Sequence, residues 1–209
     1  MKTYIFDYNG TIIDDVKIAV ECENEMLQER GLPCGYTIQQ YQEMFTIPME
    51  DYYRSIGYTF EKESFENVAN EFTFLYAKKF SKAGLCEGVI ELLEKIRNNH
   101  DQCVILSSCH DVLLHEQCDQ LGISSYFTKI MGIENCLGGS KKDIANAWFV
   151  SSGIKKEDCV YFGDTMADQE TAMHIGVENI ILVATGHQSY RRLKEVNPLT
   201  IHSLKEFNL

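Results

Sequence analysis

Short apolar runs rich in β-branched residues recur along the chain and predict the strands of a sheet. Five such runs occur, at residues 3–6, 103–106, 126–131, 159–162 and 180–184. Their length and near-continuous apolar character are typical of strands buried on both faces. Between them, apolar residues repeat at helical spacing in three segments, at residues 89–96, 112–121 and 144–148. From residue 86 onward, strand and helix therefore alternate, which predicts an α/β fold with a parallel sheet covered by helices.

Residues 15–83 break this alternation and predict a helical insert. Apolar residues repeat at helical spacing over residues 16–27 and 65–76, and strand signals are almost absent. Residues 37–40 match a capping box, in which the first and fourth residues satisfy each other's backbone groups at the start of a helix. An insert after the first strand can lie over the carboxyl ends of the strands, where open α/β sheets bind ligands.

The composition indicates a globular protein and narrows its partners. The chain has 209 residues, 44% of them hydrophobic and 24% charged, enough for one core or for a core with a smaller insert. Its net charge of −12 argues against nucleic acid or an anionic membrane as the main partner, because both would repel it. The N-terminus shows no cleavable signal pattern and no apolar run reaches membrane-spanning length, so we expect a cytoplasmic protein.

The eight cysteines are expected to be reduced. They make up too small a share of the chain for a disulfide scaffold, and none forms a C-x-x-C pair. Four of them lie in or beside predicted strands and are expected to act as small buried hydrophobic residues: Cys103, Cys109, Cys136 and Cys159.

The segment FDYNGTIIDD, residues 6–15, raises the first question about chemistry. Asn9-Gly10 between apolar residues is the usual signature of a two-residue β-hairpin. A strand that feeds an α/β sheet should instead end in a loop, which would leave Asp7 as a carboxylate at the strand's carboxyl end. Taken alone, the segment is compatible with both interpretations.

Two further segments carry polar side chains at a strand end or a helix start. Ser107 and Ser108 follow an apolar strand, although a lone serine there is usually a helix N-cap, with Asp111 as a rival cap. Lys141 stands at the start of a predicted helix, where a lysine is usually solvated. Each residue has a structural explanation, but all of them are expected at the carboxyl edge of the sheet.

A fourth segment places two acids where a strand gives way to a helix. Asp164 follows the strand that ends near Gly163, and Asp168 comes four residues later. Two acids at this spacing share one face of a helix start and offer oxygen ligands that suit Mg²⁺. N-capping by Asp164 alone is the structural alternative.

The order and content of these four segments resemble the haloacid dehalogenase superfamily. The resemblance covers the whole chain, and its most specific motifs are Asp7-x-Asn9-Gly10-Thr11 and Gly163-Asp164-Thr165-x-x-Asp168. It implies a Rossmann-like parallel sheet core at residues 1–14 and 84–209, with a small α-helical cap domain inserted at residues 15–83. It also implies a Mg²⁺-dependent phosphatase, similar to phosphoglycolate phosphatases, that acts on a small phosphorylated metabolite.

The resemblance assigns catalytic roles by position. Asp7 would be the nucleophile that forms an aspartyl-phosphate, and Ser107 would hydrogen-bond the phosphoryl oxygens. Lys141 would hold the nucleophile and offset charge on the transferring group; Lys142 competes for this role, but the spacing to Ile144, the first buried helix position, favours Lys141. These roles agree with the chemistry, because a phosphate ester dianion repels a carboxylate unless cations and donors stand between them.

The resemblance also assigns the metal and substrate contacts. Mg²⁺ would be held by Asp7, Asp164 and the backbone carbonyl of Asn9, with Asp168 orienting the site through water. Such a site, with few carboxylates and room for water and substrate oxygen, suits Mg²⁺. The candidate substrate contacts are Thr11, Ser108, Arg54 and His187.

Asn9 departs from the superfamily's usual pattern. Most of its phosphatases carry a second aspartate at this position as general acid and base, a function that typically contributes about 10² to 10⁴ in rate. An amide cannot exchange that proton, although the segment resembles a subgroup of phosphatases that carry asparagine there. Three outcomes are open: a preference for acyl or aryl phosphates, an acid borrowed from His187 or His110, or a slow enzyme that mainly binds its ligand.

Two classes of alternative function remain. Dehalogenases of the superfamily use the aspartate on carbon without a metal, against which the pair Asp164 and Asp168 argues; phosphonatases need a cap lysine, and none stands out here. A weakly catalytic protein that binds a phosphometabolite and presents a surface to a partner is the other alternative, and Asn9 is its best support. Phosphoglycolate is the default substrate through the resemblance, with Arg54 as the partner of its carboxylate.

Overall fold

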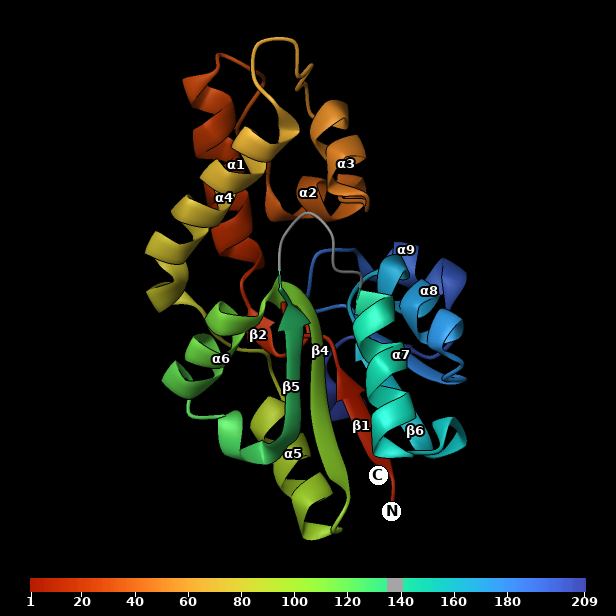
Figure 1. Ribbon diagram of the computed structural model, residues 1–209. Coiled ribbons are helices and arrows are strands. Elements are labelled where there is room, and N and C mark those ends of the chain that lie inside the picture. The colour runs from red at the N-terminus through yellow and green to blue at the C-terminus, as the bar shows by residue number, and fades with distance from the viewer. Residues whose placement is uncertain (135–140) are drawn as a thin grey trace.

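The centre of the protein is a parallel sheet of six strands in the order β5-β4-β1-β6-β7-β8. The structure is a computed structural model that describes residues 1–134 and 141–209 (Figure 1). The strands are β1 Thr3–Phe6, β4 Gln102–His110, β5 Phe127–Ile133, β6 Cys159–Gly163, β7 Asn179–Val183 and β8 Thr200–Ile201. All five strand pairings in this sheet are parallel. The predicted α/β fold with a parallel sheet is therefore confirmed.

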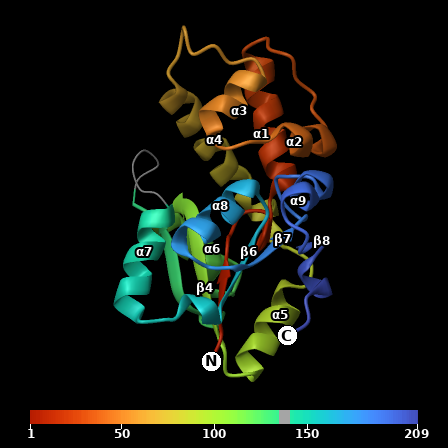
Figure 2. The same ribbon diagram turned by 90° about the vertical axis from the view of Figure 1, so that its right-hand side faces the viewer.

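Helices cover both faces of the sheet (Figures 1 and 2). One face carries α5 Val89–Asn98 and α6 Asp111–Gln120, and the other carries α7 Lys141–Ser152, α8 Met166–Ile175 and α9 Tyr190–Val196. Successive side chains of a strand point to opposite faces, so Tyr4 and Phe6 join the first hydrophobic cluster and Ile5 joins the second. This burial on both faces explains why the strands are almost continuously apolar.

Strand β4 is longer than its apolar run suggested. Pairing with β5 continues to His110, with a shift of register between Leu106 and His110. Ser107 and Ser108 therefore belong to the last part of the strand and do not follow it. The apolar pattern did not predict this extension because its residues are largely polar. Backbone pairing at the end of a strand does not require apolar side chains.

The remaining helices form a separate layer, which we call the helical segment (residues 16–82). It contains α1 Val16–Glu29, α2 Ile38–Met44, α3 Met49–Ser55, α4 Phe65–Lys79 and the 3₁₀ turn η1 Phe80–Lys82. These helices share a hydrophobic cluster of their own. The capping box at Thr37 and Gln40 is present at the start of α2, as the sequence predicted.

The helical segment lies over the carboxyl ends of the strands (Figures 1 and 2). Its two connections to the core run side by side, because β2 Ile13–Asp14 pairs with β3 Gly84–Leu85 in antiparallel fashion. A second contact is made by α2, where Gln42 Nε2 donates to the carbonyl of Gly186 at 2.7 Å. This arrangement encloses the carboxyl edge of the sheet between the two layers.

The expectations about the cysteines and about membrane-spanning segments can be compared with the structure. No disulfide joins the seven described cysteines; Cys103 and Cys159 are buried, Cys109 is half-buried, and Cys136 lies outside the described residues. In the part of the chain that the structure describes, no helix combines the length and apolar character needed to cross a membrane.

Candidate active site

The loop after β1 brings Asp7 to the carboxyl edge of the sheet. The backbone N–H of Asp7 donates to the carbonyl of Phe162 at 2.8 Å, which holds the residue beside β6. Since β1 pairs only in parallel with β4 and β6, Asn9-Gly10 is a loop and no hairpin. Gly10 adopts φ of +70°, and a Cβ there would lie 2.5 Å from Asp164 Oδ2. Glycine therefore allows the loop to pack directly against Asp164.

Asp164 and Asp168 reach the site from the junction of β6 and α8. Thr165 is the N-cap of α8 and forms a capping box with Asp168, so Asp164 precedes the cap and does not serve as one. Its carboxylate instead accepts the backbone N–H of His187 at 2.6 Å and lies 3.5 Å from Thr11 Oγ1. Asp164 is therefore not the N-cap of α8. It connects the loop before α8 to the loops that carry Thr11 and His187.

Lys141 joins two of these acids. It is the first residue of α7, and its Nζ lies 2.5 Å from Asp7 Oδ1 and 2.6 Å from Asp168 Oδ1. Asp168 Oδ1 also accepts the hydroxyl of Tyr161 at 3.2 Å. The structure therefore places Lys141 beside Asp7, although the reason given for preferring it was wrong: Ile144 is only half-buried, and the first buried residue of α7 is Ala145.

The three carboxylates form a compact acidic cluster. Oxygens of Asp7, Asp164 and Asp168 lie within 4.8 Å of one another, and all three residues are buried. Burial raises the pKa of Asp7 to about 6 although Lys141 opposes the rise. Burial also raises the pKa of Asp164 well above its ordinary value; His187 opposes this, and the charges of Asp7 and Asp168 add to it. A buried excess of carboxylate oxygen with one lysine fits a hard divalent cation such as Mg²⁺.

The other candidate residues of these motifs, Ser107, Thr11 and Ser108, differ in how far they are buried. Ser107 is buried, and its Oγ accepts the backbone N–H of Cys109 at 3.0 Å. Thr11 is fully buried beside Asp164. Ser108 is exposed at the end of β4.

Asn9 is held by a buried acid that the sequence did not single out. Its Nδ2 donates to Asp15 Oδ2 at 2.8 Å and lies 3.1 Å from the hydroxyl of Tyr76. Asp15 also accepts the hydroxyl of Tyr76 at 2.7 Å and the backbone N–H of Gly10 at 2.9 Å. Asp15 is only 1% exposed, and its carboxylate links the loop after β1 to α4 of the helical segment.

His187 completes this network from the loop after β7. Its Nε2 lies 3.5 Å from Asp15 Oδ1, and its Nδ1 lies 2.7 Å from the hydroxyl of Tyr41 in α2. Burial lowers the pKa of His187, but the charges of Asp15, Asp164 and Asp7 outweigh it and raise that pKa to about 9. Burial would raise the pKa of Asp15, yet His187 and the hydrogen bonds from Asn9 and Tyr76 hold it below its ordinary value. The two groups therefore form an ion pair at neutral pH.

Arg54 does not join these residues. Its side chain is 49% exposed and pairs with Glu50 one helical turn away at 2.6 Å. The guanidinium also lies 4.7 Å from the ring centroid of Phe60. These contacts are all within the helical segment, so in this structure the residue expected to meet a substrate carboxylate is engaged elsewhere.

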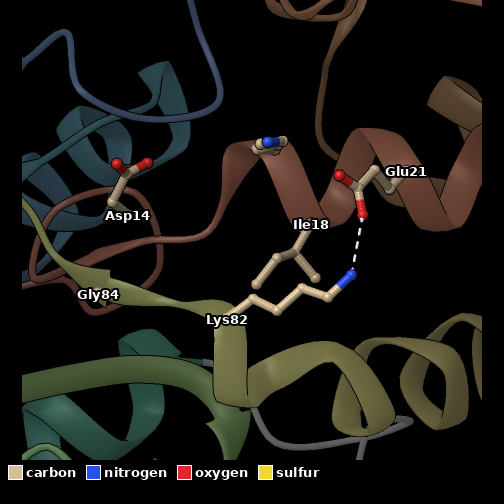
Figure 3. A pocket seen from close by; sticks show the side chains of 6 residues that line it. Asp14, Ile18, Glu21, Lys82 and Gly84 are labelled. Atoms are coloured by element: carbon tan, nitrogen blue, oxygen red, sulfur yellow. Dashed lines mark ion pairs between the residues drawn. The ribbon is translucent and has the colours of Figure 1, made fainter.

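A separate hollow of about 220 Å³ lies beside the paired strands β2 and β3 (Figure 3). It is lined by Asp14, Lys17, Ile18, Glu21, Lys82 and Gly84. Lys82 Nζ spans it toward Glu21 at 3.8 Å. None of the acids of the cluster lines this hollow, which is therefore distinct from the candidate active site.

Comparison with known proteins decides the family. The family described as haloacid dehalogenase-like hydrolase matches residues 4–182. The chain belongs to the haloacid dehalogenase-like hydrolase family. The match includes the loop after β1, the helical segment, Lys141 and the pair Asp164 and Asp168. The resemblance stated from four short segments is confirmed, and so is the expectation that the protein is an enzyme.

Known proteins resemble this chain in sequence and in structure. Phosphoglycolate phosphatase 1 of Pseudomonas aeruginosa is 24% identical over 213 residues, covering 98% of this chain and 78% of that protein. A haloacid dehalogenase-like hydrolase from Streptococcus pneumoniae superimposes with a TM-score of 0.80 at 20% identity, covering 99% of this chain and 96% of that chain. A family IA haloacid dehalogenase-like hydrolase from Entamoeba histolytica superimposes with a TM-score of 0.77 at 22% identity. The superposition covers 100% of this chain and 96% of that chain. The Rossmann-like architecture predicted for the core is therefore confirmed.

Proposed function

We propose that this hydrolase cleaves phosphate monoesters of small metabolites, with Asp7 as the nucleophile and Mg²⁺ as the cofactor. The observation that carries the proposal is the position of Asp7 at the carboxyl end of β1, paired with Lys141 and clustered with Asp164 and Asp168. The phosphatase name of the Pseudomonas aeruginosa relative supports the same reaction class.

Covalent catalysis divides the reaction into two steps at phosphorus. Lys141 binds Asp7 Oδ1, which leaves Oδ2 to attack the phosphoryl group in line with the ester oxygen. The P–O bond to the leaving group breaks, and an aspartyl-phosphate forms on Asp7. Water then attacks the phosphorus, releasing phosphate and regenerating the carboxylate. Lys141 offsets charge in both steps, and Ser107 is the proposed donor to the phosphoryl oxygens.

The acidic cluster is the proposed magnesium site. Asp7, Asp164 and the backbone carbonyl of Asn9 would hold the ion, with Asp168 acting through water. When bound, Mg²⁺ would offset the negative charge of the phosphoryl group and keep Asp7 ionised at neutral pH. Without it, burial favours the protonated form of Asp7 up to about pH 6.

Residues 15–83, which contain the helical segment, are the proposed cap domain, and residues 1–14 and 84–209 are the proposed core. The position of the helical segment over the carboxyl edge of the sheet would exclude water from the reaction (Figure 1). His187 stays a proposed substrate contact, although Tyr41 and Asp15 lie at its two ring nitrogens in this structure. Thr11 and Ser108 remain proposed contacts, whereas the position of Arg54 gives its proposed role no support.

A second candidate function follows from Asn9. Its amide donates to Asp15 and cannot supply a proton to a departing alkoxide. A protein that binds a phosphorylated ligand and turns it over slowly, or that reports on it to a partner, is consistent with this contact.

Hydrolysis of p-nitrophenyl phosphate tests the proposed function. The wild type should show turnover that depends on Mg²⁺ and disappears with EDTA. Asp7→Asn should lower kcat by on the order of 10⁴-fold or more, because it removes the nucleophile. Circular dichroism of the variant would establish that it is folded. A wild type without Mg²⁺-dependent turnover, or an Asp7→Asn variant with unchanged turnover, would contradict the proposal.

A further inference from the structure

A buried acid of the helical segment lacks a full set of partners. Glu23 of α1 is only 4% exposed. Its Oε2 accepts the hydroxyl of Tyr52 at 2.5 Å, whereas its Oε1 has no hydrogen-bond partner among the described residues. Buried polar atoms are nearly always satisfied, so an unpaired carboxylate oxygen calls for a functional explanation.

Aromatic rings connect this acid to the active site. The rings of Tyr41 and Phe45 lie 5.8 and 5.2 Å from that of Tyr52, between centroids. The same two rings lie 5.8 and 5.1 Å from the ring of His187, which belongs to the core. Glu23 is thus joined through Tyr52, and then through Tyr41 and Phe45, to the histidine that contacts Asp15 and Asp164.

The surroundings of Glu23 contain no cation that pairs with it among the described residues. Its hydrogen-bond partner is a phenol, and His187 is engaged by Asp15. Burial raises the pKa of Glu23 to about 7, and neither the hydrogen bond from Tyr52 nor the charge of His187 cancels this rise. Lys141 contacts Asp7 and Asp168, and His187 contacts Asp15, so neither of these cations pairs with Glu23. The side chain of Glu23 is therefore left without a cationic partner among the described residues.

We infer that Glu23 binds an ammonium group on the leaving group of the substrate, so that the preferred substrates are aminoalkyl phosphate monoesters. The inference rests on the proposed phosphatase function and specifies its substrate class. An ammonium group would donate to the unpaired Oε1 and replace the missing cation. The faces of the surrounding aromatic rings also attract cations. An ester that carries a carboxylate, such as phosphoglycolate, would meet Glu23 with like charge.

Access to Glu23 requires movement of α2. The rings of Tyr41 and Phe45 pack against His187 and separate Glu23 from the core in this structure. Binding of the ammonium group at Glu23 while the phosphate is held at Asp7 would require these two rings to swing away from His187. Glu23 is therefore proposed as a residue that determines specificity, with no part in the chemical steps at phosphorus.

Competing esters of matched shape test the inference. The probes are 2-aminoethyl and 3-aminopropyl phosphate, their isosteres n-propyl and n-butyl phosphate, and phosphoglycolate. We expect kcat/KM of at least one amine to exceed that of its isostere by about tenfold or more, as for a hydrogen bond to a charged group. In Glu23→Gln this ratio should fall toward one. Glu29→Gln, which removes the same charge from an exposed position of the same helix, should leave the ratio unchanged.

The outcomes separate this inference from the proposed function. Turnover of p-nitrophenyl phosphate without any preference for amines, or a preference that survives in Glu23→Gln, would overturn the inference and leave the phosphatase proposal intact. If the wild type turns over no ester, the same pairs are compared by calorimetric binding in the presence of Mg²⁺. Tighter binding of the amine in the wild type and not in Glu23→Gln would support the inference, and equal binding would overturn it.

Discussion

Asn9 and Asp15 are chemically matched to each other. The amide of Asn9 donates to a buried carboxylate that also accepts hydrogen bonds from Tyr76 and Gly10. An aspartate at position 9 would instead place a second carboxylate against Asp15, and two such groups cannot both be ionised at this distance. The loss of the usual acid and base at position 9 is therefore accompanied by a partner that favours an amide there.

Exchanging the two residues should restore acid and base catalysis. We expect Asn9→Asp with Asp15→Asn to keep the hydrogen bond and to raise kcat on an alkyl phosphate by about 10²-fold, the usual contribution of such a group. Asn9→Asp alone should give a smaller gain and lose about 1–3 kcal/mol of stability, because the two carboxylates compete for the same donors. Asp15→Asn alone is the control. If neither the single nor the double variant that carries Asn9→Asp gains turnover, the missing acid is irrelevant or already replaced.

Glu23 should make the stability of the protein depend on pH. Its pKa of about 7 in the folded state exceeds the ordinary value of 4.5, so folding favours the protonated acid. Its stabilising contribution is complete below about pH 4.5 and is lost as the pH rises through about 7. Between pH 5 and pH 8 we expect the wild type to lose about 2–3 kcal/mol relative to Glu23→Gln. Urea unfolding at the two pH values measures this difference, with Glu29→Gln as the exposed control; a difference independent of pH would contradict the assignment.

At the scale of elements, the contact between α2 and α9 is a specific attachment of the helical segment to the core. Arg192 Nη1 donates to the carbonyls of Gln42 and Phe45 at 2.9 and 2.7 Å, at the carboxyl end of α2. The Gln188 side chain donates to the same Phe45 carbonyl at 3.1 Å. These bonds satisfy carbonyls that a helix end leaves open, and they hold Tyr41 and Phe45 against His187.

Two neighbouring arginines allow this attachment to be tested. Arg192→Ala should free the end of α2 and speed amide hydrogen exchange over residues 41–48, since hydrogen bonds from a charged donor contribute about 1.5–3 kcal/mol. Arg191→Ala is the matched control: its side chain is 66% exposed and its pairs with Glu43 and Glu195 lie at the surface. Ion pairs this exposed to solvent contribute little to stability. Equal exchange in the two variants would show that Arg192 does not hold α2.

The elements that the sequence predicted correctly carry either a continuous apolar run or an apolar repeat over several helical turns. The apolar run at residues 3–6 coincides with β1, and the helices α1, α4 and α5 lie where apolar residues repeat at helical spacing. The two-residue strands β2, β3 and β8 were missed, because so short a segment contains no period. The pairing of β2 with β3 depends on residues about 70 positions apart, which no local pattern reports.

At the scale of the whole molecule, the topology of the sheet explains why the acidic cluster could be predicted from the sequence alone. Parallel strands bring their carboxyl ends to one edge, so residues after β1, at the start of α7 and after β6 are expected to meet. The structure brings Asp7, Lys141, Asp164 and Asp168 together at that edge. The sequence did not single out Asp15 or Glu23, because their contacts with Tyr76, Tyr52 and His187 depend on how the helical segment sits on the core. Arg54 was expected to contact the substrate, but it pairs with Glu50 of its own helix and lies away from the site.

Chemical trapping of the phosphorylated enzyme tests the central claim most directly. The protein would be mixed with Mg²⁺ and an excess of p-nitrophenyl phosphate, quenched in acid within one turnover, digested with trypsin and examined by mass spectrometry. We predict that the peptide of residues 3–17 gains the mass of one phosphoryl group, that fragmentation places it on Asp7, and that hydroxylamine removes it. A phosphoryl group on another residue, or product formation with no labelled peptide at any quench time, would contradict the account.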